Sequence, residues 1–382
     1  MYYFFILWIS YIVFADDINE EVSKEICVED RKEAARESDC ALYLAPSSLP
    51  GAGLGVFAGK YIEKYSYFTR GYAIMVNQSL AENWMMGKYS YEALVEGYLI
   101  ADLGVAMLPN HNEESNVWHL TEERSQTEED KKQKDFSFSI YRRNLEHGAS
   151  TSLRAKSDIY PGQEIFASYG GEVWFKERNI TSIASESVVM NDLKSIKEKG
   201  ICLSDYEVGE SLIPHAGLGV FAVKRYGEDD LISVAPLLPL PKDEVFAASS
   251  NEENCVLMNY CFTSERSNLA LLPVTAFGLL NHGGEGGANV KVDWHHWNDK
   301  DHETLVKTVD ELLGGDSINL FFAYRATRAI EAGEELLLDY GRKWDQLWRN
   351  YSSLEGEKER EHLLFRAPVE APDNLFPSAW NG

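Results

Sequence analysis

The residues that could do chemistry in this chain occur in pairs, because most of the sequence contains the same motifs twice. Gly53 and Gly55 open the phrase GLGVFA, and Gly217 and Gly219 open an identical phrase. Missing side chains at such glycines would let a flat, adenosine-bearing ligand approach the backbone. The alternative is a tight turn that enters a strand and uses glycine for a positive φ angle. A proline before the phrase and a strand-like run after it argue against a dinucleotide-binding fold.

Two further motifs follow each glycine phrase in the same order. An Asn-His pair comes next, and a Gly-x-Glu block that ends in Tyr-Gly closes the unit. The second glycine phrase lies 164 residues after the first, whereas the later motifs are offset by 171. A unit this long that occurs only twice indicates two domains in tandem rather than a solenoid. The polar residues concerned are Asn110, His111 and Tyr169 in the first copy, and Asn281, His282 and Tyr340 in the second.

The elements that must position these residues are mainly short strands, bounded by glycine, proline or acidic residues. We expect a first module at residues 40–175 and a second module at residues 201–348, with residues 176–200 as a linker and 349–382 as a tail. Three helices are expected, at Glu82–Gly97, Lys242–Ser249 and Arg342–Asn350. The last would place Trp344 and Trp348 on one face, where they would pack against the preceding strand.

Together the three motifs, in register and twice, resemble the SET domain of protein lysine methyltransferases, over about residues 40–175 and 201–348. The resemblance implies a β-rich α+β fold, with two tandem SET-type β-clip domains and a C-terminal pseudoknot. It also implies S-adenosyl-L-methionine as cofactor and a peptide groove joined to the cofactor cleft by a narrow channel. The implied cofactor-binding residues are Gly53, Gly55, Asn110 and His111, and Gly217, Gly219, Asn281 and His282. The implied catalytic residues are Tyr169 and Tyr340.

Methyl transfer from a sulfonium to an amine explains these residue types. The displacement is in line and needs no metal, so it depends on positioning and on electrostatics around the methyl group. The substrate ammonium, with a pKa near ~10.4, must first lose its proton, which burial in an apolar channel promotes. Tyr340 would then orient the neutral amine. The alternative for each tyrosine is a core aromatic residue whose hydroxyl bonds to the backbone.

The sequence departs from the family pattern around the Asn-His pairs. The loops read NHNEESN in the first copy and NHGGEGGAN in the second, so the cofactor loop differs in both. No cysteine-rich segment flanks either module, and Trp344 and Trp348, or Trp174 and Phe175, could cover the channel instead. The second copy, with EELLLDYG, departs least and is the better candidate for activity. The rival interpretation is an inactive SET-fold module that binds a basic peptide or protein.

Charge restricts the partners that the chain can bind. The formal net charge is −25, and an acidic surface repels phosphate backbones, which argues against direct contact with nucleic acid. The same field would attract lysine-rich proteins or peptides. The ASYG ending of the first copy is similar to that of family members that modify non-histone proteins, so the resemblance favours a non-histone substrate. The alternative is that the charge only keeps the protein soluble.

The N-terminus and the cysteines bear on the compartment. Residues 1–15 form a short apolar run with a plausible cleavage site, so we expect a cleaved signal peptide, a charged lead-in at 16–39 and a secretory or extracellular location. An uncleaved membrane anchor is the alternative; after cleavage, no transmembrane span is expected. Five scattered cysteines form no disulfide scaffold or zinc cluster, and no metal site is expected. Cys40 and Cys202 lie at similar distances before the glycine phrases, which suggests equivalent buried positions.

Overall fold

The structure is a computed structural model of a sheet-rich α+β protein, in agreement with the fold class expected from the sequence. It describes residues 40–69, 71–92, 97–122, 150–169, 175–176, 192–214, 216–250, 257–284, 286–297, 299–315, 318–353, 365, 367–372 and 375–381. The expected signal peptide and lead-in lie outside these residues. Within the described ranges, no helix combines the length and the apolar character needed to cross a membrane.

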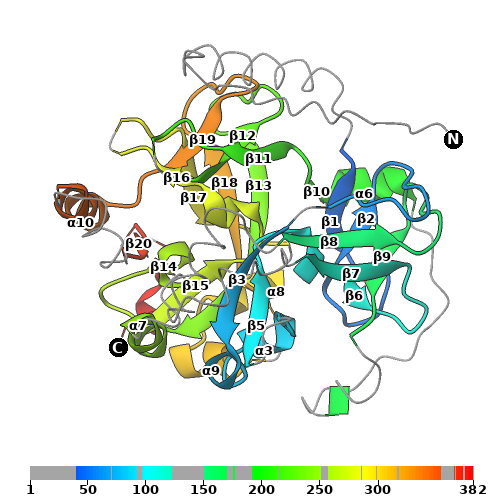
Figure 1. The fold of residues 1–382 in the computed structure, drawn as a ribbon, viewed down its shortest axis with the longest axis horizontal. Helices are drawn as coiled ribbons and strands as arrows, with labels where there is room; N and C mark the ends of the chain where they lie inside the picture. Colours follow the sequence, from blue (N-terminus) through cyan, green and yellow to red (C-terminus); the bar gives the residue numbers. More distant parts are fainter. Residues whose placement is uncertain are drawn as a thin grey trace, which may run out of the picture.

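Four sheets organise the described part of the chain (Figure 1). The first has the order β10 (Ile201–Cys202), β1 (Leu42–Pro46), β2 (Leu54–Ala58), β9 (Glu164–Ala167) and β6 (Asn110–His111). The second has the order β11 (Tyr206–Glu210), β12 (Leu218–Ala222), β19 (Glu335–Leu338) and β16 (Asn281–His282). The third has the order β17 (Val290–Trp294), β18 (Phe321–Ala326), β13 (Leu231–Pro241), β15 (Leu269–Pro273), β14 (Phe262–Thr263) and β20 (Val369–Glu370). The fourth has the order β4 (Tyr91–Glu92), β5 (Tyr98–Asp102), β3 (Gly71–Asn77), β8 (Ser150–Ala155) and β7 (Val117–Glu122).

Helices in the described ranges are short. The α-helices are α2 (Gln78–Ala81), α3 (Met86–Tyr89), α6 (Leu193–Lys199), α7 (Lys242–Ser250), α8 (Asp299–Thr304), α9 (Val309–Leu313) and α10 (Arg342–Ser352). Single turns of 3₁₀ helix are η2 (Val105–Met107), η5 (Leu257–Tyr260), η6 (Ala276–Leu279) and η7 (Ser378–Trp380). The helices expected at Lys242–Ser249 and Arg342–Asn350 are confirmed by α7 and α10. The helix expected over Glu82–Gly97 is confirmed only at α3, Met86–Tyr89. The chain becomes extended at Ser90 and forms β4, where aromatic side chains favour a strand, and residues 93–96 lie outside the described residues.

The repeat of motifs is accompanied by a repeat of strand pairing. Each glycine phrase forms a central strand, β2 or β12, that pairs antiparallel with the strand before it and with the strand of the Gly-x-Glu block. Each Asn-His pair then adds a short parallel strand, β6 or β16, at the other side of that block. The motifs therefore meet on one sheet in each half. The division into two domains and the pseudoknot stay predictions.

One hydrophobic core joins the two halves of the chain. It contains β3 and β5 of the first module and β13 and β15 of the second, which contribute equivalent positions. In each pair of strands the same register recurs, with Ile74 opposite Ala101 and Leu238 opposite Leu272. The buried residues of this shared core include Ile74, Val76, Leu99, Ala101 and Leu103, and their counterparts Leu238, Leu240, Ala270, Leu272 and Val274. Each module thus covers the apolar face of the other.

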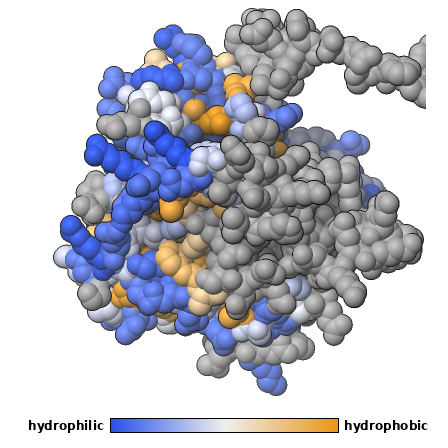
Figure 2. Space-filling view, turned by 60° about the vertical axis from the view of Figure 1, so that its left-hand side comes forward, coloured by the Kyte–Doolittle hydropathy of each residue, from blue (hydrophilic) through white to orange (hydrophobic). Residues whose placement is uncertain are grey.

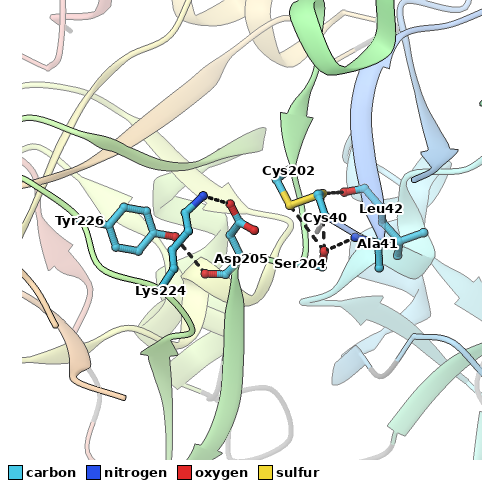
Figure 3. A network of polar contacts seen from close by, with 8 residues as sticks. All are labelled: Cys40, Ala41, Leu42, Cys202, Ser204, Asp205, Lys224 and Tyr226. Carbon is cyan, nitrogen blue, oxygen red and sulfur yellow. Dashed lines mark hydrogen bonds and ion pairs between the residues drawn. A yellow bond between two sulfur atoms is a disulfide. The ribbon is translucent and has the colours of Figure 1, made fainter. Parts of the chain in front are cut away.

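A disulfide ties the start of the first module to the start of the second (Figure 3). Cys40 and Cys202 are bonded to each other, which corrects the interpretation that they are merely equivalent buried positions. The bond accompanies the pairing of β10 with β1 and the packing of α6 on β1, although α6 lies in the expected linker. Ser204 contacts both sulfur atoms and accepts the Ala41 N–H at 2.8 Å. Cys261 is buried as a free thiol.

The end of the chain is part of the core of the second module. β20 pairs parallel with β14, and its Glu370 N–H donates to the carbonyl of Tyr340 at 3.0 Å. Trp380 is fully buried against Trp294 and Phe376. Residues of the expected tail therefore help to build the sheet beside the Tyr-Gly motif.

Candidate functional site

A buried carboxylate lies at the centre of the motif residues in the second module. Glu335, which is 4% exposed, accepts the Ser211 hydroxyl at 2.7 Å and the Leu212 N–H at 2.8 Å. Asn281 donates its amide to the same carboxylate at 3.1 Å and to the Leu218 carbonyl at 2.8 Å. Because a buried carboxylate is stable only when it is fully hydrogen-bonded, this cluster fixes the Asn-His strand against the glycine phrase.

The first module contains the same cluster with nearly the same distances. Glu164 accepts the Ser47 hydroxyl and the Ser48 N–H, both at 2.7 Å. Asn110 donates to Glu164 at 3.1 Å and to the Leu54 carbonyl at 2.8 Å. Asn110 and Asn281 therefore use their side chains to hold the fold, and any contact that they make to a ligand would come from their backbone.

The two glycines of each phrase have different tasks. A Cβ added to Gly55 would lie 2.0 Å from Glu164 Oε1, and one added to Gly219 would lie 2.2 Å from Glu335 Oε1. The second glycine is thus required by the buried carboxylate. The first glycine adopts a left-handed φ, +72° at Gly53 and +76° at Gly217, and an added Cβ at Gly53 meets nothing within 4 Å. In the first module the open backbone is therefore at Gly53.

Each Asn-His motif is tied to its tyrosine by the histidine ring. Nδ1 of His282 accepts the Tyr340 N–H at 2.9 Å, and Nδ1 of His111 accepts the Tyr169 N–H at 3.1 Å. An accepting Nδ1 places the proton of the neutral ring on Nε2. Burial lowers the pKa of both histidines, and at His282 it outweighs the opposing effects of Asp339 and Asp345. Both rings are therefore neutral at physiological pH.

His282 presents the buried donor most available to a ligand. Its side chain is 10% exposed, and Nε2 has no hydrogen-bond partner within the described residues. The carboxylate oxygen Oδ1 of Asp345 lies 3.9 Å from that atom, beyond hydrogen-bond range. A buried N–H without an acceptor costs about 1–3 kcal/mol, so a ligand that supplies an acceptor there would be stabilised.

The two motif tyrosines are buried with their hydroxyls bonded to the backbone. Tyr169 donates to the Pro109 carbonyl at 2.8 Å, and Tyr340 donates to the Leu280 carbonyl. Burial raises the pKa of both phenols well above the usual range, so each remains protonated. A tyrosine that donates to a carbonyl still has oxygen lone pairs to accept a hydrogen bond. Either residue can orient a donor, but neither can act as a base at neutral pH.

Aromatic side chains from α10 cover the second site. The Trp344 ring lies 4.7 Å from His282 and 4.9 Å from Tyr340, and Trp348 stacks on Trp344 at 5.6 Å. This confirms that Trp344 and Trp348 share a face and that Trp344 packs back toward the preceding strand. In the first module Phe175 takes the same place, 4.8 Å from His111. Trp174 lies outside the described residues.

Two hollows border the second site. A cavity of about 80 Å³ is lined by Ala216, Leu218, Asn281 and Tyr340, and on its other side by Tyr72, Ile74 and Leu103 of the first module. A groove of about 560 Å³ lies beyond Trp344, between α7 and α10, with Glu265 and Lys343 at its rim. Figure 2 brings the side with α10 forward, and hydrophilic residues cover most of its coloured surface. The first of these two hollows, the cavity, thus has motif residues of the second module on one side and a strand of the first module on the other.

The structure places every sequence-predicted site residue in one of two clusters. Gly53, Gly55, Asn110, His111 and Tyr169 gather in the first module. Gly217, Gly219, Asn281, His282 and Tyr340 gather in the second. Sequence reasoning missed the anchoring residues, which are Glu164, Ser47 and Asn116 in the first module and Glu335, Ser211 and Asn289 in the second. Their signal was present, because each of these pairs also recurs between the two copies.

Comparison with known proteins gives only limited similarity. No family model matches the chain, and no curated protein matches it. A Plasmodium falciparum structure described as a candidate histone methyltransferase matches 36% of this chain and 99% of that chain, with 22% identity and a TM-score of 0.27. The Chaetomium thermophilum polycomb repressive complex 2 matches 42% of this chain, with 16% identity and a TM-score of 0.27. A ctPRC2 structure bound to S-adenosylmethionine matches 38%, with 20% identity and a TM-score of 0.26.

The chain spans less than a fifth of the polycomb chains that it matches, namely 19% and 17%. At these TM-scores the matches assign neither a family nor an activity. The functional conclusion therefore rests on the residues of this chain.

Proposed function

We propose that this protein is an S-adenosylmethionine-dependent protein-lysine N-methyltransferase whose site lies in the second module. The observation that carries the proposal is the link from His282 to Tyr340. It joins a ring N–H that has no acceptor in the described part of the chain to a protonated, buried tyrosine beside a cavity. The sequence resemblance to SET domains gives these residues their roles. A sulfonium cofactor supplies the methyl group when bound.

The residues present fit part of such a cofactor. The backbone at Gly217, where a left-handed φ favours a residue without a side chain, would hold its polar groups together with the Nε2–H of His282, which has no acceptor among the described residues. The cavity of about 80 Å³ takes only one end of a ligand, since small-molecule sites usually measure ~300–1,000 Å³. The rest of the cofactor would lie outside that cavity.

Tyr340 would act on the substrate amine without a charge of its own. Its hydroxyl donates a hydrogen bond to the Leu280 carbonyl, so the phenol oxygen can accept a hydrogen bond from a neutral lysine amine. The same burial that keeps the phenol protonated favours the neutral amine over the ammonium. The tyrosine therefore orients the nucleophile, and water must carry its proton away before the transfer.

A second candidate function is a SET-like binding module without catalysis. The small cavity favours it, because a whole nucleoside does not fit beside Tyr340 in this conformation. On this alternative the groove of about 560 Å³ beside α10 would hold a basic peptide and no methyl group would be transferred.

Calorimetry with S-adenosylmethionine on the chain from Asp16 onward separates the two. The proposal predicts binding that His282→Ala abolishes and His111→Ala leaves unchanged. It also predicts methyl transfer to a lysine-rich peptide that Tyr340→Phe reduces at least ten-fold. Absence of cofactor binding in the folded wild type rejects the enzyme. Equal loss in both histidine variants would instead reject the assignment to the second module.

A further inference from the structure

An exposed aromatic surface on the first module has no part in the site described above. Five of the eight large hydrophobic side chains that are exposed in the described ranges belong to it, and each is between 40% and 54% exposed. These rings are Tyr61, Tyr65, Tyr67, Trp118 and Tyr160, which we call the aromatic patch.

The rings of the aromatic patch are connected by contacts among themselves and with cations. Tyr65 stacks on Trp118 with ring centres 6.1 Å apart, and Tyr61 lies 5.6 Å from Tyr160. The Arg154 guanidinium lies between 5.4 and 5.8 Å from the rings of Tyr65, Tyr67 and Trp118. The rings thus form two groups, one around Arg154 and one made by Tyr61 and Tyr160. Asp158 links the groups, because it accepts from the Tyr61 hydroxyl and from the N–H of Lys64, whose ammonium lies over Tyr65. Clustered exposed rings differ in this from single exposed residues, which would need no explanation.

Three cations and two anions border these rings, and the anions Asp158 and Glu63 both raise the pKa of Tyr61. Lys64 lies over Tyr65 at 4.7 Å, and Lys156 lies over Trp118 at 5.8 Å, in addition to Arg154. Asp158 accepts the Tyr61 hydroxyl and the Lys64 N–H, both at 2.9 Å. The surface is therefore locally positive in a chain whose formal net charge is −25.

The second module shows what this surface looks like without aromatic residues. Strand pairing makes Trp118 equivalent to Lys291, since each lies opposite the equivalent arginine, Arg154 or Arg325. Paired bridges at Ile62 and Tyr226 make Tyr61 and Tyr160 equivalent to Arg225 and Glu331. In place of two aromatic contacts the second module has two exposed ion pairs, Arg225 with Glu331 and Lys291 with Asp229.

The backbone at Tyr65 is a further sign of selection. Tyr65 has φ +68° and Asp229, its equivalent, has φ +65°; each donates its N–H to the equivalent carbonyl at 2.9 Å. Aspartate tolerates this left-handed conformation, whereas a bulky aromatic residue in it is an outlier. Such strain is retained where a side chain is needed for function. Nothing in the fold requires tyrosine here, because the second module makes the same turn with aspartate.

We propose that the aromatic patch binds a short acidic segment of a partner protein. Tyrosine, tryptophan and arginine are the residues that dominate protein–protein hot spots. The local cations attract carboxylates, while the surrounding negative field repels any polyanion that extends beyond the patch by more than the Debye length of ~8 Å. That restriction favours a short peptide segment over a nucleic acid or a large acidic surface.

A variant in which the equivalent residues of the second module replace the aromatic patch tests the proposal. The variant Tyr61→Arg, Tyr65→Asp, Trp118→Lys and Tyr160→Glu gives the first module the ion pairs of the second, with no change in net charge and with all three cations kept. A glutamate–tyrosine copolymer peptide, an oligothymidylate strand and a heparin fragment serve as probes in titrations at physiological salt. The expected result is binding of the copolymer that the variant weakens at least ten-fold.

Two further results bear on the occupant. Patch-dependent binding of the oligothymidylate or of heparin that equals or exceeds that of the copolymer overturns an acidic peptide as the occupant. Absence of patch-dependent binding to all three probes overturns the site itself. A lysine–tyrosine copolymer controls for simple aromatic adhesion. Any binding that it shows through the overall negative charge should be unchanged in the variant, because the variant alters only the patch. Circular dichroism of the variant shows whether it is folded, which the natural ion pairs of the second module lead us to expect.

Discussion

The two modules are alike in their polar interiors and different on their surfaces. Glu164 and Glu335 each hold an Asn-His strand with distances that agree within about 0.1 Å, and each is bonded to a serine and to an asparagine. On the equivalent outer surfaces, aromatic contacts in one module correspond to ion pairs in the other. A buried carboxylate fixes the position of every donor around it, because each unmet hydrogen bond is expensive. An exposed pair leaves no buried hydrogen bond unmet when it is replaced, so the fold itself does not fix which side chains form it.

The largest effect should come from the buried carboxylates. Glu335→Ala is expected to lower the free energy of unfolding by about 4 kcal/mol, since it leaves Ser211, Leu212 and Asn281 without their shared acceptor. Glu164→Ala should lower it by a similar amount, as measured by urea denaturation. The matched control is Glu331→Ala, which removes an exposed ion pair and should change stability by less than ~1 kcal/mol. A loss for Glu335→Ala no greater than that of the control contradicts this account.

The disulfide between the modules should come next. Cys40→Ser together with Cys202→Ser is expected to lower the free energy of unfolding by about 2–4 kcal/mol, because the bond closes a loop of 162 residues. Denaturation with and without a reducing agent measures the effect. Wild type in reductant should behave like the double variant, and the variant itself should be insensitive to reductant. Wild type whose stability is unchanged by reductant would show that the pairing of β10 with β1 holds the halves together without the bond.

The next effect is the dependence of the protein's stability on pH, through a buried histidine that only the first module has at this position. His119 stacks on Tyr91, and burial lowers its pKa to about 4. The folded protein thus binds this proton less readily than the unfolded chain, so stability is fully present above pH ~6.5 and falls as the pH drops toward 4. His119→Val should remove about 3 kcal/mol of that fall. Val292 occupies the equivalent position, so the second module already has the replacement.

Stability measured for wild type and His119→Val at pH 7 and pH 4.5 checks this prediction. The two proteins should differ in their pH slopes, with wild type the steeper. Parallel slopes would mean that His119 is solvated.

The smallest effect should be at the strained turn of the aromatic patch. Tyr65→Asn is expected to raise the free energy of unfolding by about 0.5–1 kcal/mol, since asparagine accepts a left-handed φ more readily than tyrosine. Asp229→Tyr should have the opposite sign. If both variants are destabilised, then the stacking of Tyr65 on Trp118 outweighs the strain, and the argument that function maintains tyrosine there loses its energetic basis.

Local patterns in the sequence were sufficient to predict part of the two sites. The glycine phrases, the Asn-His pairs and the Tyr-Gly motifs predicted which residues gather, and the tryptophan spacing predicted the covered face of α10. The helix expected over Glu82–Gly97 is longer than the observed α3, because its helix formers are interrupted by glycine and by tyrosines that favour extended backbone.

The sequence did not predict the long-range contacts. Glu164 and Glu335 are charged residues, and charge in a sequence predicts exposure, so the sequence points to a structural role only through their recurrence in both copies. The bond between Cys40 and Cys202 depends on β10 returning to the first module, which spacing alone does not specify. The shared core likewise joins apolar strands whose partners lie far away in the chain.

The shared core also differs from the interface of a symmetric dimer. Equivalent residues of β3 and β5, and of β13 and β15, contribute to it, as they would in a self-complementary two-fold interface. Both copies of the motifs lie in one polypeptide, however, so a substitution in one copy does not appear in the other. Equivalent positions of the core can therefore hold different side chains, such as Ala101 and Leu272.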